Sequence, residues 1–115
     1  MNVYDFVVIG GGMAGAAASE SLSRRGKRVA LIERYAPEHT HGGSHGDGRI
    51  IRYSYTDSLY MEMATLAYPL WDALSERAGE PLTQITGGCD FGLIGSEKLE
   101  AIVRNCEAFG FEYER

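Results

Sequence analysis

The pattern of apolar and polar positions divides the start of the chain into three short segments. Residues 4–9, Tyr-Asp-Phe-Val-Val-Ile, form an apolar run rich in β-branched side chains, which is typical of a strand buried in a parallel sheet. Small and apolar residues over 14–25 predict a helix, which Gly26 ends. Residues 29–32, Val-Ala-Leu-Ile, predict a second strand. Residues 1–33 therefore predict one strand–helix–strand unit of a parallel α/β sheet, with a right-handed crossover.

The later part of the chain shows a helical rhythm in two places. Apolar positions from Leu59 to Ala78 recur at helical spacing, and Pro69 within them is expected to kink or divide the helix. Residues 97–109 predict an amphipathic helix. Short apolar segments outside these helices predict strands: Ile85, Phe91–Ile94 and Phe111–Tyr113. We therefore expect a second, mixed or antiparallel region after the parallel unit.

Glycines occupy the key positions of a dinucleotide-binding turn between the first strand and the helix. Gly10, Gly12 and Gly15 fit the pattern G-x-G-x-x-G in the expected strand-to-helix context. Gly10 permits the sharp turn, Gly12 lets a pyrophosphate reach the backbone, and Gly15 lets the helix lie close to the strands. Met13 and Ala14 lie in the same turn, whose N–H groups face the phosphates. The simpler alternative is a glycine-rich turn that binds nothing.

An acidic residue at the end of the second strand extends this pattern. Glu33 follows the glycines at about the 20-residue spacing where a carboxylate accepts a hydrogen bond from a ribose 2′-hydroxyl. The same carboxylate repels a 2′-phosphate, so the sequence favours FAD or NAD over NADP. Neighbouring Arg34 is a further candidate cofactor contact, and it leaves that preference open. The alternative is a glutamate that only faces solvent.

A loop rich in glycine and histidine follows the second strand. Residues 34–48 contain all three histidines and four glycines, and a long loop of this kind is uncommon unless it binds something. Residues 43–55, Gly-Ser-His-Gly-Asp-Gly-Arg-Ile-Ile-Arg-Tyr-Ser-Tyr, resemble the Ser-His-Gly-x-x-Arg-Ile-Ile-Arg segment of the monomeric sarcosine oxidase and N-methyltryptophan oxidase family. The likeness continues through Leu70-Trp71 and Thr86-Gly87-Gly88, in the expected order.

This resemblance implies an FAD-dependent enzyme that oxidises the C–N bond of a secondary or N-methyl amino acid and reduces O2 to H2O2. Arg52 corresponds to the arginine that holds the substrate carboxylate, for which a guanidinium supplies two parallel hydrogen bonds. His45 and Arg49 correspond to residues beside the flavin ring, which makes these three the candidate catalytic residues. Gly43, Ser44 and Gly46 correspond to the loop that approaches the cofactor, and His45 and Arg49 are candidate cofactor contacts as well.

Each of these residues has a simpler alternative role. The two arginines, Arg49 and Arg52, would by themselves fit a solvated helical face, and a lone loop histidine is often a hydrogen-bonded structural residue. The three histidines lack supporting carboxylate or thiolate ligands, so no metal site is expected. Cys89 and Cys106 match no metal or redox spacing and are expected to be packing residues.

Composition limits the classes of partner. The chain has 16 acidic and 11 basic residues, a net charge of −5, which gives no general attraction to nucleic acid or to an anionic membrane. No apolar stretch reaches the roughly 18 residues of a membrane span, and residues 1–12 lack the pattern of a secretion signal. A cytoplasmic location is therefore expected.

The expected organisation is an FAD-binding segment with its cofactor loop over residues 1–55, and a helix and β region over 56–115 that leads into a substrate domain. Family members are much longer, so the resemblance implies that the remainder of the polypeptide is missing and that this chain alone is inactive. The expected partners are a small amine or amino acid and O2. Two alternatives stay open: another FAD-dependent dehydrogenase or D-amino-acid or glycine oxidase, and a non-catalytic dinucleotide-binding module.

Overall fold

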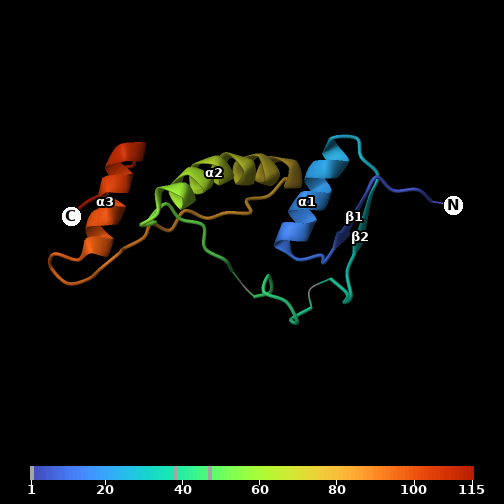
Figure 1. Ribbon diagram of the computed structural model, residues 1–115, viewed down its shortest axis with the longest axis horizontal. Helices are drawn as coiled ribbons and strands as arrows, with labels where there is room; N and C mark the ends of the chain where they lie inside the picture. The colour runs from blue at the N-terminus through green and yellow to red at the C-terminus, as the bar shows by residue number, and fades with distance from the viewer. Residues whose placement is uncertain (1, 38, 47) are drawn as a thin grey trace. The chain divides into compact units, whose positions relative to one another are not determined.

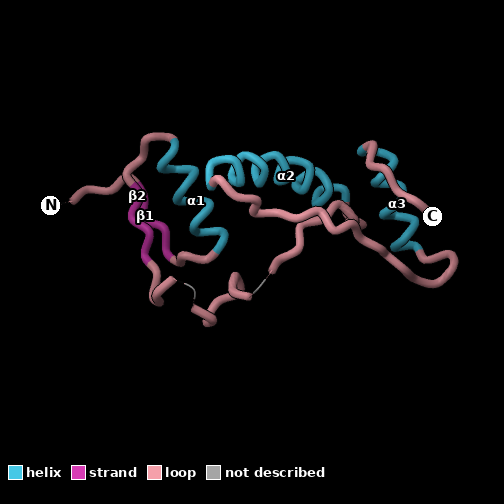
Figure 2. The backbone as a smooth tube through the Cα atoms, turned by 180° about the vertical axis from the view of Figure 1, so that it is seen from behind, coloured by secondary structure: helices cyan, strands magenta, loops and turns pink. Residues whose placement is uncertain are grey.

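The structure, a computed structural model, describes residues 2–37, 39–46 and 48–115. In chain order its elements are β1 (Phe6–Ile9), α1 (Met13–Arg24), β2 (Val29–Ile32), α2 (Ser58–Ala78) and α3 (Glu97–Phe109), labelled in Figure 1. They form two units, residues 1–49 with β1, α1 and β2, and residues 50–115 with α2 and α3. Figure 2 shows the long loop that joins α2 to α3.

The first unit is a parallel strand pair with a crossover helix. β1 and β2 pair in parallel from Phe6 opposite Val29 to Ile9 opposite Ile32, and α1 lies beside them (Figure 1). The Gly10 N–H donates to the Ile32 carbonyl at 2.8 Å, so the pairing continues into the turn. The predicted α/β class with a parallel unit is confirmed.

Helix α1 ends where the sequence predicts. Gly26 adopts a φ of +74°, a left-handed conformation that a glycine adopts without strain. Its N–H donates to the Ser23 carbonyl at 2.9 Å, and the Lys27 N–H donates to the Leu22 carbonyl at 3.2 Å. These bonds satisfy carbonyls of the last turn and direct the chain into β2.

The apolar pattern around Pro69 forms one long helix, α2, rather than two shorter ones. α2 begins after Asp57, whose Oδ1 accepts the Leu59 N–H at 2.9 Å, and ends at Gly79 with a φ of +75°. Pro69 lies inside α2 without dividing it. Proline has no N–H, so the Thr65 carbonyl lacks its usual helical donor. Only this one hydrogen bond is lost, and the turns on either side continue the helix.

Three apolar side chains are buried in the described part of the second unit. They are Met61 and Ala64 on α2 and Cys106 on α3. The prediction that Cys106 is a packing residue is confirmed. Cys89 is exposed, which corrects the same prediction for that residue, because it lies in the irregular loop between the helices.

The prediction of strands in this unit was wrong. Ile85, Phe91–Ile94 and Phe111–Tyr113 lie in irregular or turn structure. A strand requires a neighbour for its backbone N–H and C=O groups, and no described segment of the second unit pairs with these residues. The side chains of Ile85 and Phe91 are instead exposed, at 93% and 91%, and that of Phe111 is half-buried.

None of the helices within the described ranges is both long enough and apolar enough to cross a membrane.

Candidate functional site

The turn between β1 and α1 brings the backbone into close contact with itself. Gly10 has a φ of +99°, where other residues are strained. A Cβ atom on Gly15 would lie 1.9 Å from the Gly10 carbonyl oxygen, far inside the distance of any real contact. It would also lie 3.4 Å from Val8 Cγ1 on β1. The first turn of α1 therefore packs directly on the glycine turn and on the strand.

The start of α1 presents N–H donors. The Met13 N–H donates to the Ser44 hydroxyl oxygen at 3.0 Å, which brings the later loop to the helix start. Among the described residues, the N–H groups of Ala14 and Gly15 have no hydrogen-bond acceptor, and the first turn contains no acidic side chain. Free N–H groups and the positive end of the helix dipole together favour an anion at this position.

Gly12 lies at the same point, and its lack of a side chain leaves room for the loop. A Cβ atom on Gly12 would lie 3.1 Å from the Ser44 hydroxyl oxygen, so Ser44 would have to move. The close approach that the fingerprint predicts at Gly12 is thus made, in this structure, by the Ser44 hydroxyl.

The carboxylate of Glu33 is held by backbone donors. Its Oε2 accepts the Gly11 N–H at 2.5 Å, and its Oε1 accepts the N–H groups of Arg34 at 2.6 Å and Tyr35 at 3.0 Å. The hydrogen bond from Gly11, followed by that from Tyr35, lowers the pKa of Glu33 below its ordinary value of 4.5. Glu33 is therefore ionised at neutral pH, and it joins the end of β2 to the glycine turn.

An aromatic cluster, which we define as Tyr35, His39 and His41, lies next to this carboxylate. Tyr35 and His41 are stacked with ring centroids 4.4 Å apart, and Tyr35 and His39 are 4.9 Å apart. His39 Nε2 lies 3.7 Å from Glu33 Oε1, and the Arg34 guanidinium carbon lies 5.3 Å from the centre of the Tyr35 ring. Across the described ranges no three His, Cys, Asp or Glu side chains are grouped to hold a metal ion.

The sequence reasoning missed this cluster. A signal was present, because Tyr35 follows the strand-ending acid by two positions and two histidines follow at alternate positions. Only the fold shows that these rings gather beside Glu33.

The loop residues His45 and Arg49 both have backbone partners. His45 Nδ1 forms a hydrogen bond with the Gly42 carbonyl oxygen. The Arg49 guanidinium donates to the carbonyl oxygens of Gly48 at 2.6 Å and Gly43 at 3.1 Å. Arg49 thereby links the end of the loop to Gly43, the residue before Ser44. Both lie in the same unit as the glycine turn.

Arg52 belongs to the second unit, where contacts from two helices fix its segment. On one side of it, the Tyr68 hydroxyl of α2 donates to the Ile51 carbonyl at 3.1 Å. On the other, the Asn105 side-chain amide of α3 donates to the carbonyls of Tyr55 at 2.9 Å and Thr56 at 3.1 Å. The backbone around Arg52 is therefore held from both helices.

Aromatic rings reinforce this segment. Tyr53 stacks on Tyr68 with centroids 4.3 Å apart and packs against Phe111 at 3.9 Å. Burial, with smaller effects from the charges of Tyr68 and Asp72, raises the pKa of Tyr53 above 10.0. The Tyr68 side chain thus holds the Arg52 segment both through its hydroxyl and through its ring.

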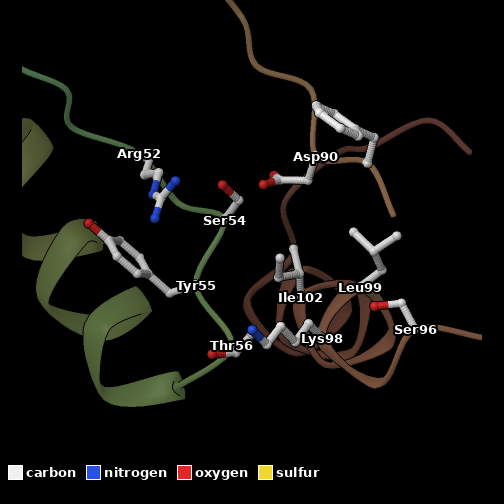
Figure 3. A pocket seen from close by; sticks show the side chains of 10 residues that line it. Arg52, Ser54, Tyr55, Thr56, Asp90, Ser96, Lys98, Leu99 and Ile102 are labelled. Atoms are coloured by element: carbon white, nitrogen blue, oxygen red, sulfur yellow. The ribbon is translucent and has the colours of Figure 1, made fainter. Parts of the chain in front are cut away.

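A cavity of about 270 Å³ adjoins Arg52 within the second unit (Figure 3). Arg52 and Ser54 line it from their segment, Asp90 from the loop after α2, and Lys98 and Leu99 from α3. Asp90 lines the same cavity as residues of α3, and after burial its charge is the next cause that raises the pKa of the Cys106 thiol. The sequence reasoning found Arg52 but missed its cavity partners, which are distant in the chain.

Comparison with known proteins agrees with the glycine turn. The sequence profile described as "FAD dependent oxidoreductase" (DAO) matches residues 5–115. The N-methyl-L-tryptophan oxidase of Salmonella newport (strain SL254) is 34% identical over 113 residues, which is 97% of this chain and 30% of that protein. The peroxisomal sarcosine oxidase of Homo sapiens is 32% identical over 113 residues, 98% of this chain and 29% of that protein. The chain thus spans about 30% of the length of these relatives.

Proposed function

Because the chain belongs to the FAD dependent oxidoreductase (DAO) family, we propose that it forms the FAD-binding N-terminal part of an amine oxidase. The enzyme would oxidise the C–N bond of a secondary or N-methyl amino acid, as the names of the relatives suggest for them. The proposed division is an FAD-binding segment over residues 1–55 and a region leading to the substrate domain over 56–115.

The observation that carries this proposal is the start of α1. The Ala14 and Gly15 N–H groups lack acceptors among the described residues, directly after a glycine turn too tight for side chains at Gly15. A diphosphate supplies the negative oxygens that such donors require. Gly10, Gly12 and Met13 would complete the contact surface. The Met13 N–H would either leave the Ser44 hydroxyl for a phosphate oxygen or donate to both.

The ribose of the adenosine half is assigned to Glu33. Its carboxylate accepts three backbone N–H groups and is ionised, which leaves lone pairs to accept from ribose hydroxyls. Arg34 would contact the same half of the cofactor. Gly43, Ser44, His45 and Arg49 would form the loop over the cofactor, since Ser44 already touches the helix start and Arg49 holds the Gly43 carbonyl.

Arg52 is proposed to hold the carboxylate of the substrate and to orient its reactive carbon. In the overall reaction the C–N bond loses two electrons and two protons to become an imine, and O2 gains them to become H2O2. When bound, FAD supplies the two-electron chemistry of this exchange. The tasks of the chain are to bind, to orient and to place cations near the developing negative charge.

The cofactor test is retention of flavin. The 115-residue chain is mixed with FAD and passed through gel filtration, and we expect the flavin absorbance to elute with the protein. Glu33→Gln should weaken retention, whereas Glu80→Gln, on the other unit, should leave it unchanged. Exclusive binding of NAD would contradict the proposal and favour a different dinucleotide-binding module.

The activity test has two parts. We propose that the chain alone is inactive, so N-methylglycine or N-methyl-L-tryptophan should leave the bound flavin oxidised in the absence of oxygen. A polypeptide of the relatives' length that carries these residues should release peroxide with such substrates. Arg52→Ala in it should raise KM for carboxylate substrates, and an unchanged KM would count against the amino-acid assignment. Oxidation without peroxide would instead indicate a dehydrogenase.

The compartment stays a prediction. We retain the cytoplasm as the expected location, and the name of the human relative places that protein in the peroxisome. Immunolocalisation in the source cell would decide between the two.

A further inference from the structure

The chain itself supplies acceptors to two N–H donors of the glycine turn. Glu33 Oε2 accepts the Gly11 N–H at 2.5 Å, and the Ser44 hydroxyl oxygen accepts the Met13 N–H at 3.0 Å. The Met13 N–H belongs to the first turn of α1, where a bound anion would find its donors. One of those donors is therefore occupied by the chain before any ligand arrives.

The two acceptors differ in how firmly they are held. Glu33 is a carboxylate that accepts three backbone N–H groups. Across the described residues, the neutral Ser44 hydroxyl has one hydrogen-bond partner, the Met13 N–H, and Ser44 is exposed. A hydrogen bond to a charged oxygen is about twice as strong as one between neutral groups. A phosphate oxygen is therefore able to replace Ser44 on its donor, whereas Glu33 keeps its place.

The Ser44 hydroxyl fills the space that the glycine turn leaves open. A Cβ atom on Gly12 would lie 3.1 Å from the Ser44 hydroxyl oxygen, so the hydroxyl lies where a side chain is missing. In a dinucleotide-binding turn this space admits a pyrophosphate. The positive end of the helix dipole favours a negative oxygen there over a neutral one, and the first turn contains no acidic side chain. Ser44 and a diphosphate thus compete for one position.

We propose that Ser44 is an internal substitute for a phosphate oxygen, and that a diphosphate has to displace it from the Met13 N–H. The inference rests on the proposed cofactor function. It adds that the Ser44 contact is autoinhibitory, because binding must first break it. The segment that moves, which we call the latch, consists of residues 42–46 together with Gly48 and Arg49.

Contacts inside the latch make Arg49 its positioning residue. The Arg49 guanidinium donates to the carbonyl oxygens of Gly43 at 3.1 Å and Gly48 at 2.6 Å. Gly46 has a φ of +116°, and a Cβ atom on it would lie 2.9 Å from Arg49 Nη1, so the guanidinium lies directly against the Gly46 backbone. Release of Ser44 therefore also moves Arg49, and this couples the start of α1 to the end of the loop.

The test is an NMR titration of the ¹⁵N-labelled 115-residue chain with inorganic pyrophosphate, followed at the amides of residues 13–15. Ser44→Ala removes the competing oxygen, and we expect it to bind pyrophosphate about threefold to tenfold more tightly than the parent chain does. FAD affinity, measured by flavin fluorescence, should rise by a similar factor. Ser44→Thr keeps a hydroxyl and should return both affinities toward those of the parent.

A second readout tests the coupling to Arg49. In the parent chain, pyrophosphate should shift the Gly43 and Arg49 amides together with those of residues 13–15. In Ser44→Ala the latch is already released, so the Gly43 and Arg49 amides should stay unmoved. Arg49→Lys keeps the positive charge but loses the paired carbonyl contacts. It should bind pyrophosphate about twofold more tightly, because the weakened latch competes less.

The matched control is Ser23→Ala, in the last turn of α1, which should bind pyrophosphate as the parent does. Equal or weaker pyrophosphate binding by Ser44→Ala would overturn the inference, because Ser44 would then support the anion. If the parent retains FAD in that case, the proposed cofactor function stands. Tighter pyrophosphate binding by Ser44→Ala, with no FAD retained by either chain, would refute the cofactor function and keep the latch. No saturable shift with pyrophosphate in either chain would refute both.

Discussion

The glycine turn of the first unit and the cavity of the second unit are built in different ways. At the turn, backbone N–H groups and the absence of side chains define the site, as the Gly15 contact with the Gly10 carbonyl shows. At the cavity, side chains from three separate segments define it, with Arg52, Asp90 and Lys98 contributed from far apart in sequence. The first site should therefore fail when a side chain is added, and the second when one is removed.

The largest expected effect breaks the glycine turn. In Gly15→Val the new Cβ atom meets the Gly10 carbonyl oxygen at 1.9 Å, so the turn and α1 must separate. We expect a loss of about 2 kcal/mol in the free energy of unfolding and no detectable FAD binding. Urea denaturation and flavin titration measure the two effects. Gly88→Val has open space around it and serves as the control, and equal loss in both variants would refute the turn argument.

A smaller effect loosens the Arg52 segment from α3. Asn105→Ala removes the hydrogen bonds to the Tyr55 and Thr56 carbonyls, and we expect the free energy of unfolding to fall by about 1–2 kcal/mol. N-methylglycine affinity should fall with it, whereas FAD affinity should not change. Calorimetry and the two ligand titrations check this separation. Asn2→Ala, at an exposed position, is the matched control.

Ser44→Ala tests the one side-chain hydroxyl that contacts the start of α1. The Met13 N–H loses its acceptor, and we expect a loss of about 1 kcal/mol in the free energy of unfolding. Thermal denaturation measures it. Ser23→Ala, in the last turn of α1, should not lower stability, and a Ser44→Ala chain as stable as the parent would mean that the bond contributes nothing.

The smallest effect is a pH dependence at Glu33. Its hydrogen bonds, first that from Gly11, lower its pKa, so their contribution is present above the unfolded pKa near 4.5 and is lost as pH falls through the lower folded pKa. A carbon-detected NMR titration should give a Glu33 pKa below 4.5. Glu33→Gln should lack this acid-side loss of stability. A titration at or above the ordinary value would contradict the observed bonds.

The same contrast explains what the sequence could predict. The strand–helix–strand unit and the glycine turn depend on neighbours in sequence, so residues 4–33 predict both the elements and the close approach at Gly15. The ends of α2 and α3 were also predictable, because Gly79 and Gly110 adopt the left-handed conformation that ends helices. In each case the deciding interaction is local.

The predictions failed where the deciding interaction is distant. Ile85 and Phe91–Ile94 have apolar strand character, but strand formation depends on a partner that no sequence pattern supplies and no described segment provides. Arg52 was found through the family resemblance, whereas the hydroxyl of Tyr68, the amide of Asn105 and the carboxylate of Asp90 reach its neighbourhood only through the fold.

The most direct measurement of the central claim is an amide-resolved titration of the labelled chain with FAD. We predict that the Ala14 and Gly15 resonances shift most and saturate, that ADP produces the same shifts, and that FMN, which lacks the diphosphate and adenosine, does not. Saturable FAD binding that leaves the resonances of residues 10–15 unmoved, or no binding at all, would contradict the account.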